Sequence, residues 1–157
     1  MKPISQETID SLWDELHGED QKLFEATVTE FTEKQPFLLA YILSRATTDP
    51  ELTNLQRPDI FLLGTAVYHV FASQENPPSL VDEAVIEAKE QANVDLLDSV
   101  SEVEMDEIMS KYGQETLFAE VVQYIAQAQD DIGKARDEHE FSMDLLHFKT
   151  MIDCLDQ

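Results

Sequence analysis

Cysteine, glycine and positively charged residues are scarce in this sequence of 157 residues. It contains one cysteine, Cys154, four isolated glycines, and 10 lysines and arginines against 33 aspartates and glutamates. A single cysteine cannot form a disulfide within the chain, which is typical of a protein from a reducing compartment. The four isolated glycines also exclude a glycine-rich phosphate-binding loop, because such a loop needs several glycines close together.

The shortage of basic residues gives the chain a formal net charge of -23 at pH 7. Nucleic acids and anionic membranes attract proteins through basic patches, so this charge argues against both as direct partners. It is compatible with a basic protein partner, with cation binding, or with solubility alone. The imbalance is greatest between Ser79 and Asp131, where fourteen acids stand against Lys89 and Lys111.

Long apolar segments are missing as well. Apart from His69, residues 60–72 carry no ionisable charge, but this stretch is shorter than the ~20 residues that a membrane-spanning helix needs. Residues 1–20 turn acidic early and contain no apolar core of signal-peptide length. We therefore expect a soluble, cytoplasmic protein.

What the chain does contain is enough apolar material for one globular core. A hydrophobic content of 43% is close to the average of globular proteins. A chain of this length buries about 70% of its unfolded surface, so it needs no disulfide to hold a core. No low-complexity tract or long linker divides it, and we predict a single all-helical domain over residues 1–157.

Residues 59–74 predict a helix at the centre of the fold. Their apolar side chains fall on every side of a helical wheel, so this helix has to be covered on all sides. Gly64 inside it costs about 1 kcal/mol relative to alanine, which predicts a close helix crossing at that point. For His69 we expect a buried, hydrogen-bonded and neutral imidazole, because burial lowers the pKa of histidine. The alternative is a catalytic histidine that meets a carboxylate in space.

Helical periodicity and capping residues predict the other helices, for an all-α bundle of seven or eight helices. They are expected at about 5–17, 20–34, 36–46, 79–96, 101–112, 114–132 and 137–155, with a short element at 51–56. The seven consecutive apolar residues 37–43 could also form a buried strand, but Pro36 at the first position favours a helix. The expected N-caps are Ser5, Asp49, Ser79 and either Ser99 or Ser101.

The apolar pattern also predicts which side of each helix faces the core. In the last helix, apolar residues recur at intervals of four, three, four and three, which is the spacing of a heptad seam. We expect Trp13 to anchor the first helix in the core. The inward sets are Val81, Ala84, Val85, Ala88, Ala92 and Leu96, then Val103 and Ile108 with Met105 and Met109 as further candidates, and finally Phe141, Leu145, Phe148, Ile152 and Leu155.

Sequence motifs that carry known chemistry are absent. There is no zinc-spaced cysteine cluster, no G-x-S-x-G and no H-E-x-x-H. Asp144 and His147, three residues apart, resemble half of the ligand set of a di-iron bundle, but the chain has no second Glu-x-x-His pair. We therefore interpret them as a solvent-exposed polar pair, and we predict no catalytic, cofactor-binding or metal-ligating residue.

One further row of residues lies on the last helix. Met143, His147, Met151 and Cys154 fall within about 80° of one another around the helix axis. Sulfur and imidazole ligands suit copper(I) or zinc. The simpler interpretation is that methionine and cysteine fill space on a partly buried flank. If the row is exposed, it would form a partner or dimer contact.

Taken together, these features predict a non-enzymatic, acidic protein–protein interaction or regulatory domain. Its partner would be a basic protein or a second copy of the chain. The first alternative is a metal-binding helical bundle, or an enzyme, with a site assembled from scattered Glu, Asp and His. The second is an acidic inhibitor that imitates the phosphate charge of nucleic acid, which would require its acids to be aligned on one face.

Overall fold

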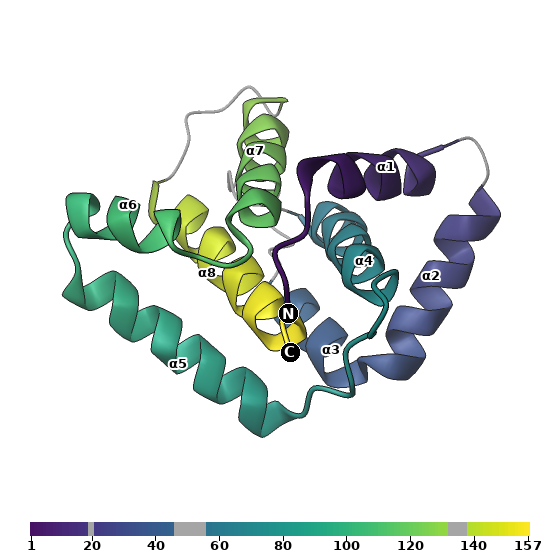
Figure 1. Ribbon diagram of the computed structural model, residues 1–157, viewed down its shortest axis with the longest axis horizontal. Helices are drawn as coiled ribbons and strands as arrows, with labels where there is room; N and C mark the ends of the chain where they lie inside the picture. The colour runs from purple at the N-terminus through teal and green to yellow at the C-terminus, as the bar shows by residue number, and fades with distance from the viewer. Residues whose placement is uncertain (19–20, 46–55, 132–137) are drawn as a thin grey trace.

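Eight α-helices make up the regular structure of the described residues (Figure 1). A computed structural model describes residues 1–18, 21–45, 56–131 and 138–157. In chain order the helices are α1 (Gln6–Leu16), α2 (Gln21–Lys34), α3 (Pro36–Ser44), α4 (Arg57–Ala72), α5 (Glu83–Ser99), α6 (Glu102–Ser110), α7 (Glu115–Asp131) and α8 (Glu138–Leu155). The predicted all-α fold is confirmed, as is the choice of helix over strand for residues 36–44. Except for Gln56, the short element expected at 51–56 lies outside the described residues.

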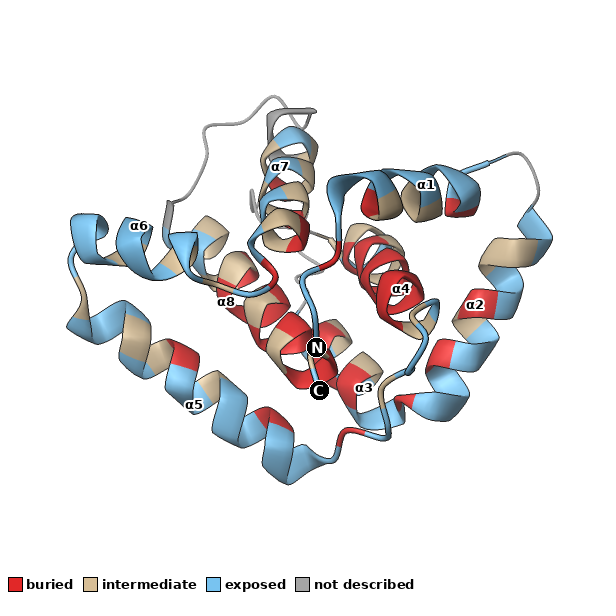
Figure 2. Ribbon diagram, viewed as in Figure 1, coloured by how far each residue is buried: buried red, intermediate tan, exposed pale blue. Residues whose placement is uncertain are grey.

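The central position predicted for α4 is confirmed. Ile60 and all residues from 63 to 71 are buried, because α1, α2, α3, α7 and α8 all pack against this helix. Figure 2 shows α4 and the C-terminal part of α8 as the most completely buried helices. A helix that is apolar all round is therefore covered all round, as its sequence requires.

Gly64 lies at a close crossing of α3 and α4, as predicted. A Cβ atom at this position would lie 2.3 Å from Cδ1 of Ile42 on α3 and 3.8 Å from the ring of Phe31 on α2. Real Cβ atoms do not approach other atoms as closely as 2.3 Å. The absent side chain therefore lets α3 lie directly against α4.

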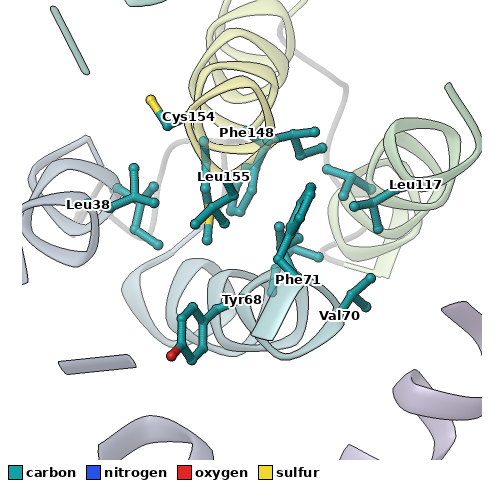
Figure 3. Close-up of a cluster of buried hydrophobic side chains, with 14 of the residues drawn as sticks. Leu38, Tyr68, Val70, Phe71, Leu117, Phe148, Cys154 and Leu155 are labelled. Carbon is teal, nitrogen blue, oxygen red and sulfur yellow. The ribbon is translucent and has the colours of Figure 1, made fainter. Parts of the chain in front are cut away.

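Side chains from α4, α7 and α8 meet in the centre of the core (Figure 3). Phe71, Leu117 and Phe148 are fully buried, and Figure 3 shows them grouped between these three helices. The predicted α8 seam is buried completely in its second half, at Phe148, Ile152 and Leu155. In its first half Phe141 and Leu145 are only half-buried. Trp13, predicted to be a core anchor, is also half-buried at the edge, with its ring 6.4 Å from that of Tyr124.

Two buried glutamines join distant segments through their amide groups. Gln114 accepts from the Ile4 N–H at 3.3 Å and donates to the Asp156 carboxylate at 3.0 Å, so the two ends of the chain lie side by side (Figure 1). Gln35 donates to the Ser79 carbonyl and accepts from the Val81 N–H, both at 2.9 Å. These bonds hold the loop between α4 and α5 against the body of the protein.

Ser5 is confirmed as an N-cap, and of the two alternatives before α6 the cap is Ser101 and not Ser99; Asp49 lies outside the described residues. Ser5 accepts from the Thr8 N–H at 3.2 Å, and Ser101 forms a capping box with Glu104. Ser79 is wrong as the cap of α5. The cap is Asp82, which accepts from the Val85 N–H at 2.9 Å. Aspartate is as good an N-cap as the serine three residues earlier.

Helices α5 and α6 form an outer arm whose predicted inward faces are only partly correct. Val81 is buried just before α5, and Leu96, Met105 and Met109 are half-buried. Ala84, Ala88 and Ala92 are exposed, and the buried residues of α5 are instead Ile86 and Asn93, of which Asn93 donates hydrogen bonds to Thr150 and Asp153 on α8. On α6 no residue is buried, and Val103 is 80% exposed. Figure 2 shows both helices mostly exposed. Ile108 is 37% exposed, so packing in the core of the protein does not account for the apolar side chains of Val103 and Ile108.

None of the helices in the described ranges combines the length and the apolar character needed to cross a membrane.

Candidate binding groove

A hollow of about 140 Å³ lies where α5, α6, α7 and α8 meet. We call it the α5–α8 groove. A cavity near 150 Å³ holds a benzene-sized group, so this hollow has room for one large apolar side chain. Its lining is mainly aliphatic, thioether and aromatic, and consists of Asn93, Leu96 and Leu97 from α5, Met105 and Met109 from α6, Phe118 from α7, and Ser142, Leu145, Leu146 and Lys149 from α8.

The α6 side of the groove is its most adaptable wall. Met105 and Met109 are one helical turn apart and both are half-buried. Methionine side chains are unbranched and flexible, so they adjust to partners of different shape. On the α5 side, Leu97 is 46% exposed. The groove is therefore apolar, open to solvent, and bounded on one side by residues that can move to fit an occupant.

A hydrogen-bonded network forms the polar end of the groove. Lys149 Nζ donates to the Asn93 amide oxygen at 2.8 Å and to the Asp153 carboxylate at 2.9 Å. The Asn93 amide nitrogen in turn donates to Thr150 at 3.1 Å and to Asp153 at 3.0 Å. The Tyr112 hydroxyl donates to the other Asp153 oxygen at 2.5 Å, and its ring lies 4.6 Å from Lys149 Nζ. This network holds α5 against α8, and its polar side chains form their hydrogen bonds with one another.

The network also changes the pKa of Tyr112, whose hydroxyl is bound to Asp153. Burial raises the pKa of Tyr112, and the negative charge of Asp153 raises it further. The phenol therefore stays protonated and keeps donating to Asp153 at neutral pH. Because Lys149 is paired with Asp153, its positive charge does not offset the acids of the outer arm.

Carboxylates surround the groove on the outer arm. Residues 82–110 contain ten acids and a single base, Lys89. All ten are exposed except Glu90, which is half-buried. Asp98 follows the groove residue Leu97, while Glu102 and Asp106 lie within one turn of Met105. The groove is thus an apolar surface with negative charge on both of the helices that form its outer walls.

Exposed acids are not confined to the outer arm. Glu7 and Asp10 on α1 and Glu25 and Glu33 on α2 are exposed as well. The acids therefore lie on several sides of the protein, and this distribution does not favour imitation of the phosphate charge of nucleic acid. What distinguishes the outer arm is the apolar groove between its acids.

A second hollow, of about 400 Å³, lies between α3 and α5. It is lined by Phe37, Ala40, Tyr41, Ser44 and Arg45 from α3 and by Glu83, Ile86, Glu87 and Glu90 from α5. Arg45 places one nitrogen 3.4 Å from each Glu90 carboxylate oxygen, and its guanidinium carbon lies 5.3 Å from the centre of the Tyr41 ring. Three glutamates beside two aromatic rings form a site that suits a cation, and the guanidinium of Arg45 is the cation that lies there.

Tyr41 separates this second hollow from the buried flank of α8. Its hydroxyl lies near Glu90 and Thr150 but has no hydrogen-bond partner of good geometry. Burial raises the pKa of Tyr41, and Glu90 raises it further, so the phenol stays neutral. The His147 ring packs edge-on against the Tyr41 ring, with 5.9 Å between the ring centres.

The structure corrects the prediction of a solvent-exposed Asp144–His147 pair. Asp144 is 3% exposed and His147 is 7% exposed. The error has a physical cause: α8 packs on α3 and α5 as well as on α4 and α7, so the flank that carries these residues is also covered. Burial, followed by the positive charge of Arg45, lowers the pKa of His147 to about 4, and His147 Nδ1 has no hydrogen-bond partner.

The sulfur-containing row on α8 fills space, as the simpler interpretation predicted. Met151 and Cys154 are fully buried and Met143 is half-buried. Burial raises the pKa of the Cys154 thiol to about 12, with a further contribution from Asp153, so the thiol is neutral and unreactive. Within the described residues, no group of three or more His, Cys, Asp or Glu side chains is arranged to hold a metal ion.

His69 is buried, as predicted, but its Nε2 atom lacks a hydrogen-bond partner. The nearest carboxylate oxygen of Glu15 is 4.0 Å from this atom. Burial lowers the pKa of His69, although the charges of Glu15 and Glu30 act in the opposite direction. At 4.0 Å the Glu15 carboxylate is too far away to accept a hydrogen bond from this imidazole.

Sequence reasoning did not identify the groove. The signal was present in the four apolar residues Leu96, Leu97, Met105 and Met109, which stand among closely spaced acids. Only the fold shows that α7 and α8 complete the hollow with Phe118 and Leu145. No protein family, curated protein or solved structure matches this chain, so its function has to be inferred from the chemistry of its own surface.

Proposed function

We propose that this protein is a non-enzymatic interaction domain that binds a basic segment of a partner protein on the outer arm of α5 and α6. The observation that supports this proposal is the α5–α8 groove, an open apolar surface flanked by acids from both helices. Exposed apolar surface with a polar rim is typical of protein interaction sites. The acids determine the sign of charge that a partner has to carry.

A basic partner is favoured over a second copy of the same chain. Two copies would each bring a net charge of -23, and their mutual repulsion would oppose association. A basic segment would instead be attracted over long distances, which increases the association rate. The hollow between α3 and α5 supports the same choice, since it already accommodates the guanidinium of Arg45 beside Glu90 and Tyr41.

The test compares two charge-reversal variants that change the net charge equally. One replaces four exposed acids on the arm, Asp95, Asp98, Glu102 and Asp106, by lysine. The other replaces Glu7, Asp10, Asp14 and Glu25 on α1 and α2 by lysine. The probe is a fluorescein-labelled peptide of leucine and lysine, whose binding is followed by fluorescence anisotropy at low and at physiological salt.

We expect the peptide to bind the wild type in a salt-sensitive way. The arm variant should bind at least about tenfold more weakly than the α1–α2 variant, because only the arm acids lie next to the bound peptide. If the two variants weakened binding equally, the peptide would be responding to net charge alone, and binding at the outer arm would be contradicted. No binding to the wild type at low salt would refute the proposed function.

A further inference from the structure

We infer that the α5–α8 groove receives the apolar face of a basic amphipathic helix, and that one large apolar side chain of this helix, a Phe, Leu or Met, fills the hollow. The inference rests on the proposed function and specifies the class of partner. Binding of an amphipathic helix in an apolar groove is a recurring mode of peptide recognition.

The size of the hollow limits the occupant. Its volume of about 140 Å³ matches a benzene-sized group, so one aromatic or long aliphatic side chain fills it. The flexible Met105 and Met109 can close around side chains of somewhat different shape. The exposed part of Leu97 then covers the neighbouring turn of the bound helix.

The polar end of the groove also favours an apolar occupant. Lys149 and Asn93 line the hollow, but both are hydrogen-bonded to the Asp153 carboxylate and to each other. An occupant therefore does not have to provide a polar group to satisfy them. A carboxylate-bearing ligand would in addition be repelled by the acids of the arm.

The positions of the acids require cations on both sides of the apolar anchor. Asp98 lies on the α5 wall, and Glu102 and Asp106 lie on the α6 wall. In a helix, residues three and four positions from the anchor continue the apolar stripe, and the positions that border this stripe lie on its two sides. Lysines or arginines at these bordering positions would reach the carboxylates. An apolar stripe with basic flanks is the pattern of a basic amphipathic helix.

The first experiment separates charge from amphipathic pattern. Two labelled peptides have the same leucine and lysine composition; in one the leucines form a single helical stripe, and in the other their order is scrambled to distribute them around the helix. We expect the striped peptide to bind about 10- to 100-fold more tightly, as burial of one large apolar side chain implies. Equal affinities would overturn the inference and leave the proposed function standing. No binding of either peptide would refute both.

The second experiment locates the bound peptide with two matched variants. Leu97→Asp and Val103→Asp add the same charge at exposed positions of the arm, but only Leu97 lines the groove. Leu97→Asp should weaken the striped peptide about tenfold or more, because a carboxylate would be buried against its apolar face. Val103→Asp should leave the affinity unchanged or slightly higher. Equal effects of the two changes would place the peptide outside the groove.

Methionine methyl signals in NMR spectra give an independent readout on the wild-type protein. The signals of Met105 and Met109 should shift when the striped peptide is added. The signal of Met151 should stay in place, since this residue is fully buried in the core away from the groove. A shift of Met151 alone, or no shift of Met105 and Met109 at saturation, would contradict binding in the groove.

Discussion

Single polar residues inside the core are the features that the sequence describes least well. His147 and Gln35 are both buried, yet nothing in their neighbours distinguishes them from polar residues on a surface. A polar residue is buried when its groups find partners or when the surrounding packing covers it, and both conditions depend on distant segments. Gln35 finds its partners at Ser79 and Val81, more than forty residues away. Only its position before Pro36 was visible in the sequence.

The buried His147 makes the stability of the protein depend on pH. Its pKa in the fold is lowered to about 4, whereas an unfolded histidine has a pKa of about 6.5. This neutral imidazole therefore contributes its full stability above about pH 6.5 and loses it as the pH falls towards 4, because only the unfolded state takes up the proton. Burial and the positive charge of Arg45 lower the pKa of His147, and the negative charge of Glu90 acts in the opposite direction.

We predict that His147→Leu removes this part of the pH dependence. Between pH 7 and pH 5 the unfolding free energy of the wild type should fall by about 2 kcal/mol more than that of the variant. Urea unfolding at the two pH values measures both quantities under the same conditions. Parallel losses in the wild type and in the variant would show that His147 does not titrate in this way.

At the scale of the element, the strength of the apolar pattern decided which predictions succeeded. The α4 helix was predicted correctly because large apolar residues surround it. The three alanines predicted to face inward on α5 are exposed, because alanines bury little area and are tolerated on a surface. The buried residues of α5 are Ile86 and the polar Asn93, which donates a hydrogen bond to Thr150 on α8. The α8 seam was predicted from large residues spaced as a heptad, and its C-terminal half is fully buried.

The crossing of α3 and α4 can be tested by filling it. Gly64→Ala gains about 1 kcal/mol of helix propensity but forces Ile42 Cδ1 to move, and overpacking of this kind costs about 1–3 kcal/mol. We expect a net loss of about 1 kcal/mol for the single change. In an Ile42→Val background, which lacks the clashing methyl group, Gly64→Ala should be neutral or stabilising. Denaturant unfolding of all four proteins in this cycle gives the coupling. Additive effects would contradict a direct contact at this crossing.

At the scale of the whole molecule, the excess of acids acts on stability as well as on partner choice. The chain of 157 residues has a net charge of -23, and its acidic side chains repel one another more in the compact folded state than in the expanded unfolded state. Few of these charges are neutralised within the protein, since the whole chain has only 10 lysines and arginines. Screening of these charges by salt should therefore increase the free energy of unfolding.

We predict that the melting temperature rises with ionic strength. Between about 10 mM and about 150 mM NaCl the screening length falls from roughly 30 Å to roughly 8 Å, which reduces repulsion between distant acids. A gain of about 1 kcal/mol corresponds to about 2–4 °C for a chain of this size. KCl should give the same rise, because screening is not specific to one cation. A melting temperature that stays constant or falls with salt would show that self-repulsion is not a significant term.

The sequence by itself determined the all-α class, the buried α4 helix, the close crossing at Gly64 and the acidic surface. These properties are local or compositional: helical periodicity, the absence of polar residues and the sum of the charges are all contained in the chain. The tertiary structure decided the burial of His147, the orientation of α5 and the α5–α8 groove. Each of these depends on which helices meet, and a hollow lined by four helices exists only after their packing has brought Leu96, Met109, Phe118 and Leu145 together.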